Sequence, residues 1–322
     1  MPSFDVSVIG ELNLDLILYG LPSGLKLECE LLASDLSVTL GSSSAIFAHN
    51  LAALGSKVSF NSSVGGDPLG QICLDRLKES SVDVSRVCQM PDKITGLTVI
   101  LPQGQQRYIL TYPGTMAEMK STDLDMDYLL DAKHLHLSSY FLQKALQAGL
   151  PDIFRRAKEA GLTTSLDTND DPEDRWSSDL QGLLKYVDIL LPNEREACKM
   201  ASSPDVNVAL EALAKKVPII VVKRGAKGAV LRSKDGTFLA MPPSVEVLDS
   251  VGAGDSFDAG FIHEFVRGKS VRECLQFAAS TGALSVTRAG GTEAFRDAGH
   301  RDAFLQNNVP AAVKEVPSDD WL

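Results

Sequence analysis

Short apolar runs alternate with amphipathic segments along most of the chain, and this alternation predicts the secondary structure. Runs rich in Val, Ile and Leu read as strands, and segments whose apolar positions recur about every four residues read as helices. Strands are expected at about 4–9, 58–64, 134–140, 162–167, 187–191 and 219–222. Helices are expected at about 41–55, 151–160, 174–186, 205–216, 255–267 and 270–284. Strands that alternate with helices imply an α/β fold with a mostly parallel sheet covered on both faces.

Two stretches outside this alternation predict a second, smaller sheet. Residues 13–39 alternate loosely between leucine and polar positions. Residues 95–112 read as a hairpin, with apolar strands on either side of a Gln/Gly turn at 103–106. We therefore expect a small β-sheet that is built from about 13–39 and 95–113 and inserted into the larger fold.

The most informative stretch is the glycine-rich run Asp249–Phe261, which reads Asp-Ser-Val-Gly-Ala-Gly-Asp-Ser-Phe-Asp-Ala-Gly-Phe. It follows a strand-like run at 245–248 and leads into a helix that is expected to begin at about Asp255. Backbone N–H groups at such a helix start bind anions, and glycines let a phosphate approach the main chain. A carboxylate here is suited to take a proton from a hydroxyl that attacks a phosphoryl group. The alternative is that Asp255 only caps the helix and the glycines only form a turn.

Composition and charge narrow the class of protein. The 322 residues, 44% hydrophobic and 23% charged, permit one large α/β domain or one with a small appendage, and we expect a single domain that spans 1–322. The net charge of −11 argues against nucleic acid or an anionic membrane as a partner. Five scattered cysteines without a Cys-x-x-Cys pair fit a reducing cytoplasm better than a disulfide framework or a zinc site. No segment reaches the roughly 18 apolar residues of a membrane helix, so we expect a cytoplasmic protein.

The run at 249–261 closely resembles the carboxy-terminal signature of the PfkB carbohydrate kinases, in the ribokinase-like superfamily, with Ser250 where Thr is commoner. Gly41–Gly55 resembles the amino-terminal signature less closely, because Ser42 replaces a glycine and Ile46 replaces a sugar-contacting asparagine. The resemblance implies a three-layer α/β/α domain in which the small sheet is a lid that covers the sugar and excludes water. It also implies transfer of the γ-phosphoryl group of ATP to a sugar hydroxyl, with Mg²⁺.

The same resemblance assigns roles to individual positions. Asp255 is the expected general base, and the residues expected to turn their N–H groups toward the transferring phosphoryl group are Gly252, Ala253 and Gly254. The positions expected to bind the sugar are Asn13, Asp15, Gly41, Ser42, Ser43 and Arg107. Those expected at the nucleotide are Asn193, Glu196, Lys223, Gly225, Gly228, Gly254 and Ser280, with Glu196 reaching Mg²⁺ through water. A monovalent cation, K⁺, is expected at Asp249, Val251, Ser285, Arg288 and Gly290.

Several of these positions have a plainer interpretation. Asn13 and Asp15 would suit a solvated loop. Glu196 would suit the first turn of a helix, where the helix dipole favours a carboxylate. Lys223 either pairs with phosphate oxygens or faces solvent. The charge of Arg288 would make a cation unnecessary if it lay near the expected ion site.

The amide that is missing at Ile46 leaves three candidates to take its place in the first helix. They are Ser42, Ser43 and, one helical turn later, Asn50. His49, beside Asn50, is expected to pack within the helix and not to act as a base.

Three other functions compete with the sugar kinase. A nucleoside kinase of the same superfamily would place apolar or aromatic residues against a base, and the residues available for this are Ile46, Phe47, Tyr108 and Tyr112. A non-catalytic sugar- or nucleotide-sensing protein would most simply lack the base, and Asp255 is present. A dinucleotide-binding dehydrogenase needs Gly-x-Gly-x-x-Gly after the first strand, where the sequence has no such motif. Free sugars, sugar acids, phosphosugars and nucleosides all stay open as substrates, and we expect a homodimer formed through the lid.

Overall fold

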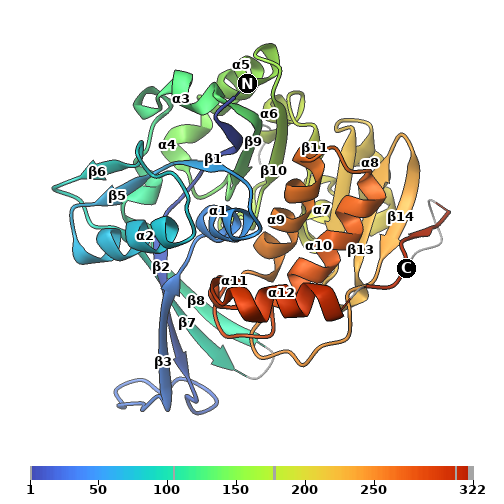
Figure 1. The fold of residues 1–322 in the computed structure, drawn as a ribbon. Helices are drawn as coiled ribbons and strands as arrows, with labels where there is room; N and C mark the ends of the chain where they lie inside the picture. The colour runs from blue at the N-terminus through green and yellow to red at the C-terminus, as the bar shows by residue number, and fades with distance from the viewer. Residues whose placement is uncertain (1, 104–105, 177–178, 309, 318–322) are drawn as a thin grey trace.

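The computed structural model describes residues 2–103, 106–176, 179–308 and 310–317, and its centre is a nine-stranded sheet (Figure 1). The strand order is β15-β14-β13-β12-β11-β10-β9-β1-β4. The strands that run parallel are β1 (Phe4–Ile9), β4 (Val58–Asn61), β9 (Ala132–Ser138), β10 (Thr163–Asp167), β11 (Ile189–Leu190) and β12 (Ile219–Lys223). An antiparallel edge follows, made of β13 (Ala229–Ser233), β14 (Gly236–Ala240) and β15 (Lys314–Glu315). The expected mostly parallel sheet is confirmed.

Helices cover both faces of this sheet, because its strands are apolar on both sides. One layer contains α1 (Ser43–Ala53), α2 (Pro68–Glu79), α9 (Ala253–Val266), α10 (Val271–Ser285), α11 (Glu293–Arg296) and α12 (Ala298–Asn307). The other contains α3 (Met126–Leu130), α4 (Lys144–Gln147), α5 (Leu150–Glu159), α6 (Asp179–Leu184), α7 (Glu194–Met200) and α8 (Val206–Ala214). In β9, Leu137 packs under the second layer, whereas His136 faces the first and stacks on Phe47 of α1 with ring centroids 3.7 Å apart. The result is a three-layer α/β/α domain.

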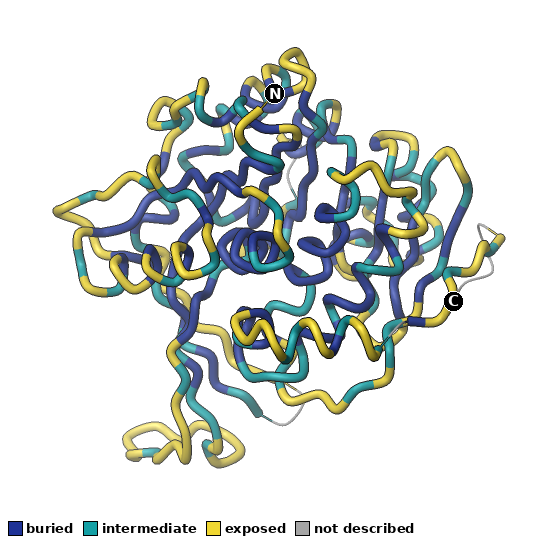
Figure 2. Tube along the Cα trace, in the orientation of Figure 1, coloured by how far each residue is buried: buried dark blue, intermediate teal, exposed yellow. Residues whose placement is uncertain are grey.

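A separate four-stranded sheet projects from the large one, and we call it the lid sheet (Figure 1). Its strands are β2 (Asn13–Tyr19), β3 (Asp35–Leu40), β7 (Gly96–Gln103) and β8 (Gln106–Tyr112), in the order β3-β2-β7-β8. The predicted hairpin is confirmed, with Ile100 opposite Ile109, and its turn residues Gly104 and Gln105 lie outside the described residues. The loop between β2 and β3 is mostly exposed (Figure 2), and within this sheet β8 is exposed whereas β2 is largely buried.

The prediction of one strand at 58–64 is wrong in one respect. This segment forms two strands, and they belong to two different sheets. β4 pairs with β1, whereas β5 (Ser63–Gly65) pairs with β6 (Cys88–Met90), which the sequence pattern did not reveal. Ser62 lies between β4 and β5, and its carbonyl accepts a hydrogen bond from the Cys88 N–H at 2.9 Å. The partner strand is distant in the sequence, so the local apolar pattern does not mark the break.

Two further expectations are corrected. Residues 245–248 do not form a strand. They follow Pro242 and Pro243, which have no N–H group to donate to a sheet. The Leu248 N–H donates to the Val286 carbonyl at 2.8 Å and not to a neighbouring strand. The helix expected at 174–186 is shorter and corresponds to α6. The Asp171 carboxylate accepts hydrogen bonds from the backbone N–H groups of Glu173, Arg175 and Trp176 and holds these residues in a compact loop.

The remaining segments are short. The 3-10 helices among the described residues are η1 (Gly114–Ala117), η2 (Ser121–Asp123) and η3 (Gly225–Lys227). After Pro310, β15 adds a strand to the edge of the sheet with both of its residues exposed at the surface, and residues 318–322 lie outside the described ranges. The five cysteines, 29, 73, 88, 198 and 274, are free thiols. Within the described ranges, no helix has both the length and the apolar character needed to span a bilayer.

Candidate active site

Helix α9 begins at a glycine turn in the middle of the molecule. Gly252 is its N-cap, in the left-handed conformation with φ of 72°, and the helix starts at Ala253, two residues earlier than expected. A Cβ atom at Gly252 would lie 2.6 Å from the Cα atom of Gly291, so glycine is needed both for its backbone conformation and for space. The first N–H groups of a helix have no partner within the helix, so this turn presents donors to an anion.

Asp255 lies in the first turn of α9 and is only 8% exposed. Burial is the main cause that raises its pKa to about 7, and the neighbouring Asp167 carboxylate adds to the effect. The ammonium of Lys223 and the nearby Ser43 hydroxyl act in the opposite direction. A carboxyl group whose pKa is near neutrality, at an anion-binding turn, is suited to general base catalysis.

Lys223, at the end of β12, lies between two buried carboxylates. Its Nζ atom is 2.7 Å from Asp167 Oδ2 and 2.8 Å from Asp258 Oδ2. Burial opposes its charge, but these carboxylates raise the pKa of Lys223 above its ordinary value. The solvent-facing alternative is therefore wrong. The ammonium lies beside the glycine turn, 3.5 Å from where a Cβ atom would stand on Gly254.

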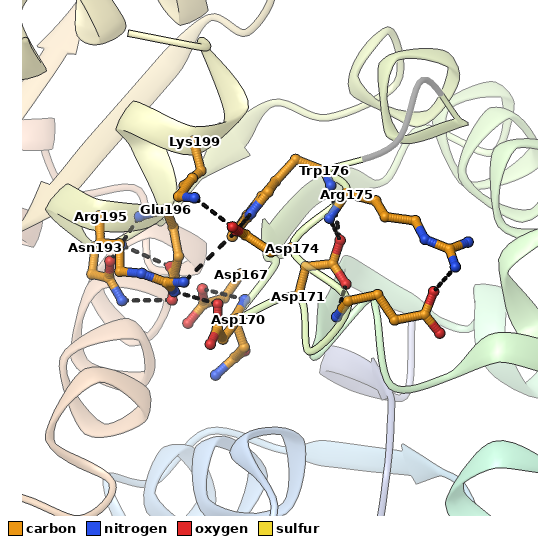
Figure 3. A network of polar contacts seen from close by, with 12 residues as sticks. Asp167, Asp170, Asp171, Asp174, Arg175, Trp176, Asn193, Arg195, Glu196 and Lys199 are labelled. Carbon is orange, nitrogen blue, oxygen red and sulfur yellow. Dashed lines mark hydrogen bonds and ion pairs between the residues drawn. The ribbon is translucent and has the colours of Figure 1, made fainter. Parts of the chain in front are cut away.

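Asn193 and Glu196 form a capping box at the start of α7, seen at the left of Figure 3. The Glu196 carboxylate accepts the Asn193 N–H at 2.9 Å, and the Asn193 side chain accepts the Glu196 N–H at 2.9 Å. Burial, followed by the nearby Asp167, raises the pKa of Glu196 to about 8. The helix-start interpretation of Glu196 is therefore confirmed, and the same carboxyl group lies on the cleft rim near Asp167, with both of its oxygens accepting hydrogen bonds from Asn193.

The loop after β10 is joined to α7 by charged side chains. Figure 3 shows Arg195 paired with Asp170 and Lys199 with Asp174, the latter at 2.6 Å. These ion pairs hold the loop beside Glu196, so the carboxyl end of β10 and the start of α7 form one continuous rim.

Asn13 and Asp15 lie in β2, where the lid sheet meets the large sheet, and both side chains are buried, so the solvated-loop alternative is wrong. Asn13 donates to Thr98 Oγ1 at 3.0 Å and also bonds the Ser42 hydroxyl. Burial and then the charge of Asp255 raise the pKa of Asp15 to about 7. A Cβ atom on Gly41 would overlap Asp15 Oδ1, so that glycine makes room for the carboxyl group.

At the position of the replaced asparagine, Ile46 is buried against the glycine turn. Side chains added at Gly252 or Gly291 would collide with Ile46, which shows that it packs behind the glycine turn. Asn50 does not take its place, because its side-chain amide donates to Ser256 Oγ and to the Gly291 carbonyl, both at 2.9 Å. His49 is buried beside it as expected, and burial lowers the pKa of His49 to about 4. Of the three candidates, Ser42 and Ser43 remain at the cleft.

A cavity of about 560 Å³ opens on the other side of the glycine turn. Its walls near the turn carry Lys223, Gly225, Gly228 and Gly254, four of the positions expected at the nucleotide. The rest of its lining is mainly apolar and includes Val245, Val247, Phe257, Ala279, Ala283 and Val286. Ser280 is buried in α10 and is not among the lining residues, although Ala279 beside it is. This explains the irregular 241–248 segment, since its side chains form a cavity wall.

The segments expected to share a monovalent cation are brought together. The Asp249 carboxylate accepts the N–H groups of Val251 at 3.0 Å and Gly290 at 2.9 Å. Ser285 Oγ is buried without a hydrogen-bond partner among the described residues. Arg288 instead pairs with Asp297 at 2.7 Å on the partly exposed side of the loop, so its guanidinium does not occupy the place of an ion.

The lid sheet also reaches the turn. Arg107 of β8 donates to Ser250 Oγ at 3.1 Å. Its guanidinium lowers the pKa of Asp15, against the larger effect of burial. Sequence reasoning gave no role to Asp258, Ser139 or Asn169, although Asn169 follows a strand at the carboxyl edge, where ligands bind in such sheets.

Residues 3–298 match the model of the pfkB family carbohydrate kinases. The chain belongs to this family. It is therefore a carbohydrate kinase, a phosphotransferase whose acceptor is an alcohol group. The 2-dehydro-3-deoxygluconokinase of Bacillus subtilis is 31% identical to it, over 76% of this chain and 79% of that protein.

Solved structures agree with the fold. The Arabidopsis thaliana ribokinase complexed with ribose and ATP is 25% identical, with a TM-score of 0.79, covering 94% of this chain and 99% of that one. An E. coli protein described as a ribokinase II, in complex with ATP and Mg²⁺, is also 25% identical, with a TM-score of 0.83 and the same coverage. The ribokinase-like architecture expected from the sequence is confirmed.

Proposed function

We propose that this PfkB-family member is an ATP-dependent sugar kinase that transfers the γ-phosphoryl group of ATP to a hydroxyl of a small carbohydrate. The observation that carries the proposal is the position of Asp255. Its carboxyl group, with a pKa near 7, lies at an anion-binding helix start, with buried polar residues of β2 on one side and the 560 Å³ cavity on the other.

The sugar binds at the junction of the lid sheet and the large sheet. Asp15 and Asn13 accept and donate hydrogen bonds to its hydroxyls, and the positions that complete this end are Gly41, Ser42, Ser43 and Arg107. Ionised Asp255 takes the proton of the attacking hydroxyl as its oxygen bonds to the γ-phosphorus and the bond to the ADP oxygen breaks. The first-turn N–H groups of Gly252–Gly254 face the charge that builds up on the phosphoryl oxygens.

The nucleotide occupies the cavity. Its base lies against the apolar walls formed by residues such as Val245, Phe257 and Ala283. Its phosphates extend toward Lys223 and Gly254, with Gly225 and Gly228 leaving space for the chain of phosphates. The Lys223 ammonium is paired with the carboxylates of Asp167 and Asp258. It can contribute positive charge beside the phosphates while it keeps both of these ion pairs.

Two ions complete the proposed site. The buried oxygen donors of Glu196, with Asn193 beside it, suit Mg²⁺ held through water, because Mg²⁺ keeps several waters and needs few carboxylates. When bound, Mg²⁺ neutralises phosphate charge. The joined segments at 249–251 and 285–290 suit K⁺, which would be held by Asp249, Val251, Ser285, Arg288 and Gly290, mostly through backbone carbonyls.

We further propose that the lid sheet joins two copies in a homodimer. Exposed apolar side chains support this, namely Leu36 and Val38 on β3 and Ile109, Leu110 and Tyr112 on β8. Light scattering should give a mass near twice 34.6 kDa, and Ile109→Asp should halve it. A monomeric wild-type protein at micromolar concentration would refute the dimer and leave the kinase proposal untouched.

The nucleoside-kinase alternative is left with fewer residues that could contact a base than the sequence offered. Of its four candidate residues, Ile46 packs behind the glycine turn and Phe47 is buried against His136, which leaves Tyr108 and Tyr112 on β8. The deciding experiment is an ATP-consumption screen against free sugars, sugar acids, phosphosugars and nucleosides, with Asp255→Asn as the inactive control. Turnover only with nucleosides would overturn the sugar assignment.

A further inference from the structure

We propose that the lid sheet positions the glycine turn itself, and that Ile17, Ile100 and Tyr19 are the positioning residues through which it does so. The inference rests on the proposed function, in which the first-turn N–H groups of α9 face the transferring phosphoryl group. It gives the lid sheet a role other than covering the sugar. The N–H groups are oriented for phosphoryl transfer only while the lid sheet lies against the turn.

One face of β2 serves both the proposed sugar pocket and the turn. Because successive side chains of a strand alternate between the two faces of a sheet, Asp15, Ile17 and Tyr19 share one face. Ile17 stands opposite Ile100 of β7 in the pairing register, so Ile100 lies on that face as well. The face that carries Asp15 at the pocket therefore carries, farther along, the side chains that reach the turn.

Val251, which immediately precedes the N-cap of α9, packs against this face. It is 7% exposed and forms one buried apolar cluster with Ile17 and Ile100, against which Tyr19 packs. Both of its buried partners in this cluster belong to the lid sheet, so a lid sheet that moved away would expose Val251 to water. Burial of this side chain thus ties the position of the lid sheet to the backbone that leads into the turn.

The Asp249 carboxylate is a second point of contact. Tyr19 donates its hydroxyl to Asp249 Oδ2 at 3.4 Å. The same carboxylate accepts the N–H groups of Val251 at 3.0 Å and Gly290 at 2.9 Å. Tyr19 therefore acts on the group that joins the two segments beneath the turn.

The other strands of the lid sheet extend the contact to both of these segments. Arg107 of β8 donates to Ser250 Oγ at 3.1 Å. Thr39 of β3 donates to Oε1 of Glu293, the first residue of α11, at 3.0 Å. With Ile17 on β2 and Ile100 on β7, each strand of the lid sheet supplies at least one side chain to this contact.

The rate of phosphoryl transfer depends on where the N–H groups of the turn point. Preorganised donors stabilise the charge that develops in the transition state, and the loss of one such donor typically costs about 10²–10³-fold in rate. If the lid sheet lifts, Val251 and Asp249 lose its contacts and the turn can relax. Transfer then proceeds when an acceptor holds the lid sheet down, and transfer to water is slow when none does.

The first test is hydrogen–deuterium exchange of the protein without substrate, followed by mass spectrometry. Ile100→Ala removes packing from Val251, and the peptide that covers 249–256 should exchange roughly tenfold faster than in the wild type, because local opening becomes easier. Tyr19→Phe removes only the hydroxyl that reaches Asp249, and it should accelerate the same peptide roughly threefold.

Val99→Ala is the matched control, because Val99 neighbours Ile100 on β7 and lies on the opposite face of the lid sheet. It should leave exchange of the 249–256 peptide at the wild-type rate. A peptide that covers β12 in the large sheet should be unchanged in every variant. Unchanged exchange at 249–256 in both lid variants, or equal acceleration in the β12 peptide, would overturn the inference.

The second test is steady-state kinetics with the acceptor sugar that the ATP-consumption screen identifies. Ile100→Ala should lower kcat about tenfold and Tyr19→Phe about threefold, with the sugar KM within about twofold of the wild-type value. This pattern is expected because both side chains are assigned to the turn and not to the sugar. A raised sugar KM at unchanged kcat would show that the lid sheet acts on the sugar alone, and would overturn the inference.

Two further outcomes separate the inference from its premises. If Ile100→Ala does not fold by circular dichroism, Tyr19→Phe alone decides by the same two measurements. The exchange experiment needs no substrate, so it tests the contact between the lid sheet and the turn whatever the screen finds. Absence of turnover with every acceptor would overturn the proposed function and would leave the result of the exchange experiment standing.

Discussion

Replacing Lys223 by Met should lower the free energy of unfolding by about 3–5 kcal/mol, because the change leaves two buried carboxyl groups without the cation that they share. The Nζ atom lies 2.7 Å from Asp167 and 2.8 Å from Asp258, and the three side chains are only 11%, 3% and 1% exposed, so water does not replace the lost ammonium. Met has nearly the volume of Lys without its charge, which limits the effect of an empty space. The measurement is urea unfolding at pH 7 followed by circular dichroism.

The control is the double variant Lys223→Met/Asp167→Asn, which removes one charge of each sign. It should recover more than half of the loss, since a neutral buried group that keeps its hydrogen bonds costs far less than an unpaired charge. A single variant within 1 kcal/mol of the wild type, or a double variant no more stable than the single, would show that the ion pair does not hold this part of the cleft together.

Three further predictions concern activity. Asp255→Asn should keep sugar and nucleotide binding by calorimetry and lose about 10²–10⁴-fold in kcat; near-normal turnover would remove its role as base. Asp15→Ala should raise the sugar KM about 10- to 100-fold and change the ATP KM little, because a buried bond to a charged group is lost; an effect on ATP alone would show that the two ends of the cleft are assigned in reverse. Turnover should be higher in K⁺ than in tetramethylammonium at equal ionic strength, and Asp249→Asn should reduce this response; equal rates in both salts would count against the ion.

The sequence predicted the parts of the fold that depend on local pattern. Apolar runs located the parallel strands to within a few residues. Two of the errors have a common cause. Residues 58–64 divide between two sheets and 245–248 line a cavity, and both outcomes depend on partners that are distant in the sequence.

For the candidate site, too, the sequence predicted the local features and not the contacts between distant residues. The motif located Asp255 and the glycine turn, because a helix start with free N–H groups is a local property of the chain. The pairing of Lys223 with Asp167 joins residues 56 positions apart, and no spacing rule indicates it. The left-handed backbone of Ser139 and Asn169 is equally hidden, since neither residue type requires it. Positions on the cleft rim were thus predictable, whereas their contacts were not.

Because Ile46 stands where the family signature has a sugar-contacting asparagine, helix α1 and the lid sheet are expected to have different roles at the cleft. Ile46 packs behind Gly252 and Gly291, and Asn50 bonds Ser256 and the Gly291 carbonyl, so the buried face of α1 supports the phosphoryl end. In the proposed function, the side chains that recognise the sugar then come mainly from the lid sheet, with Asn13 and Asp15 on β2 and Arg107 on β8. Changes of substrate in this chain should therefore follow changes in the lid sheet, whereas changes in α1 should act on kcat through the glycine turn.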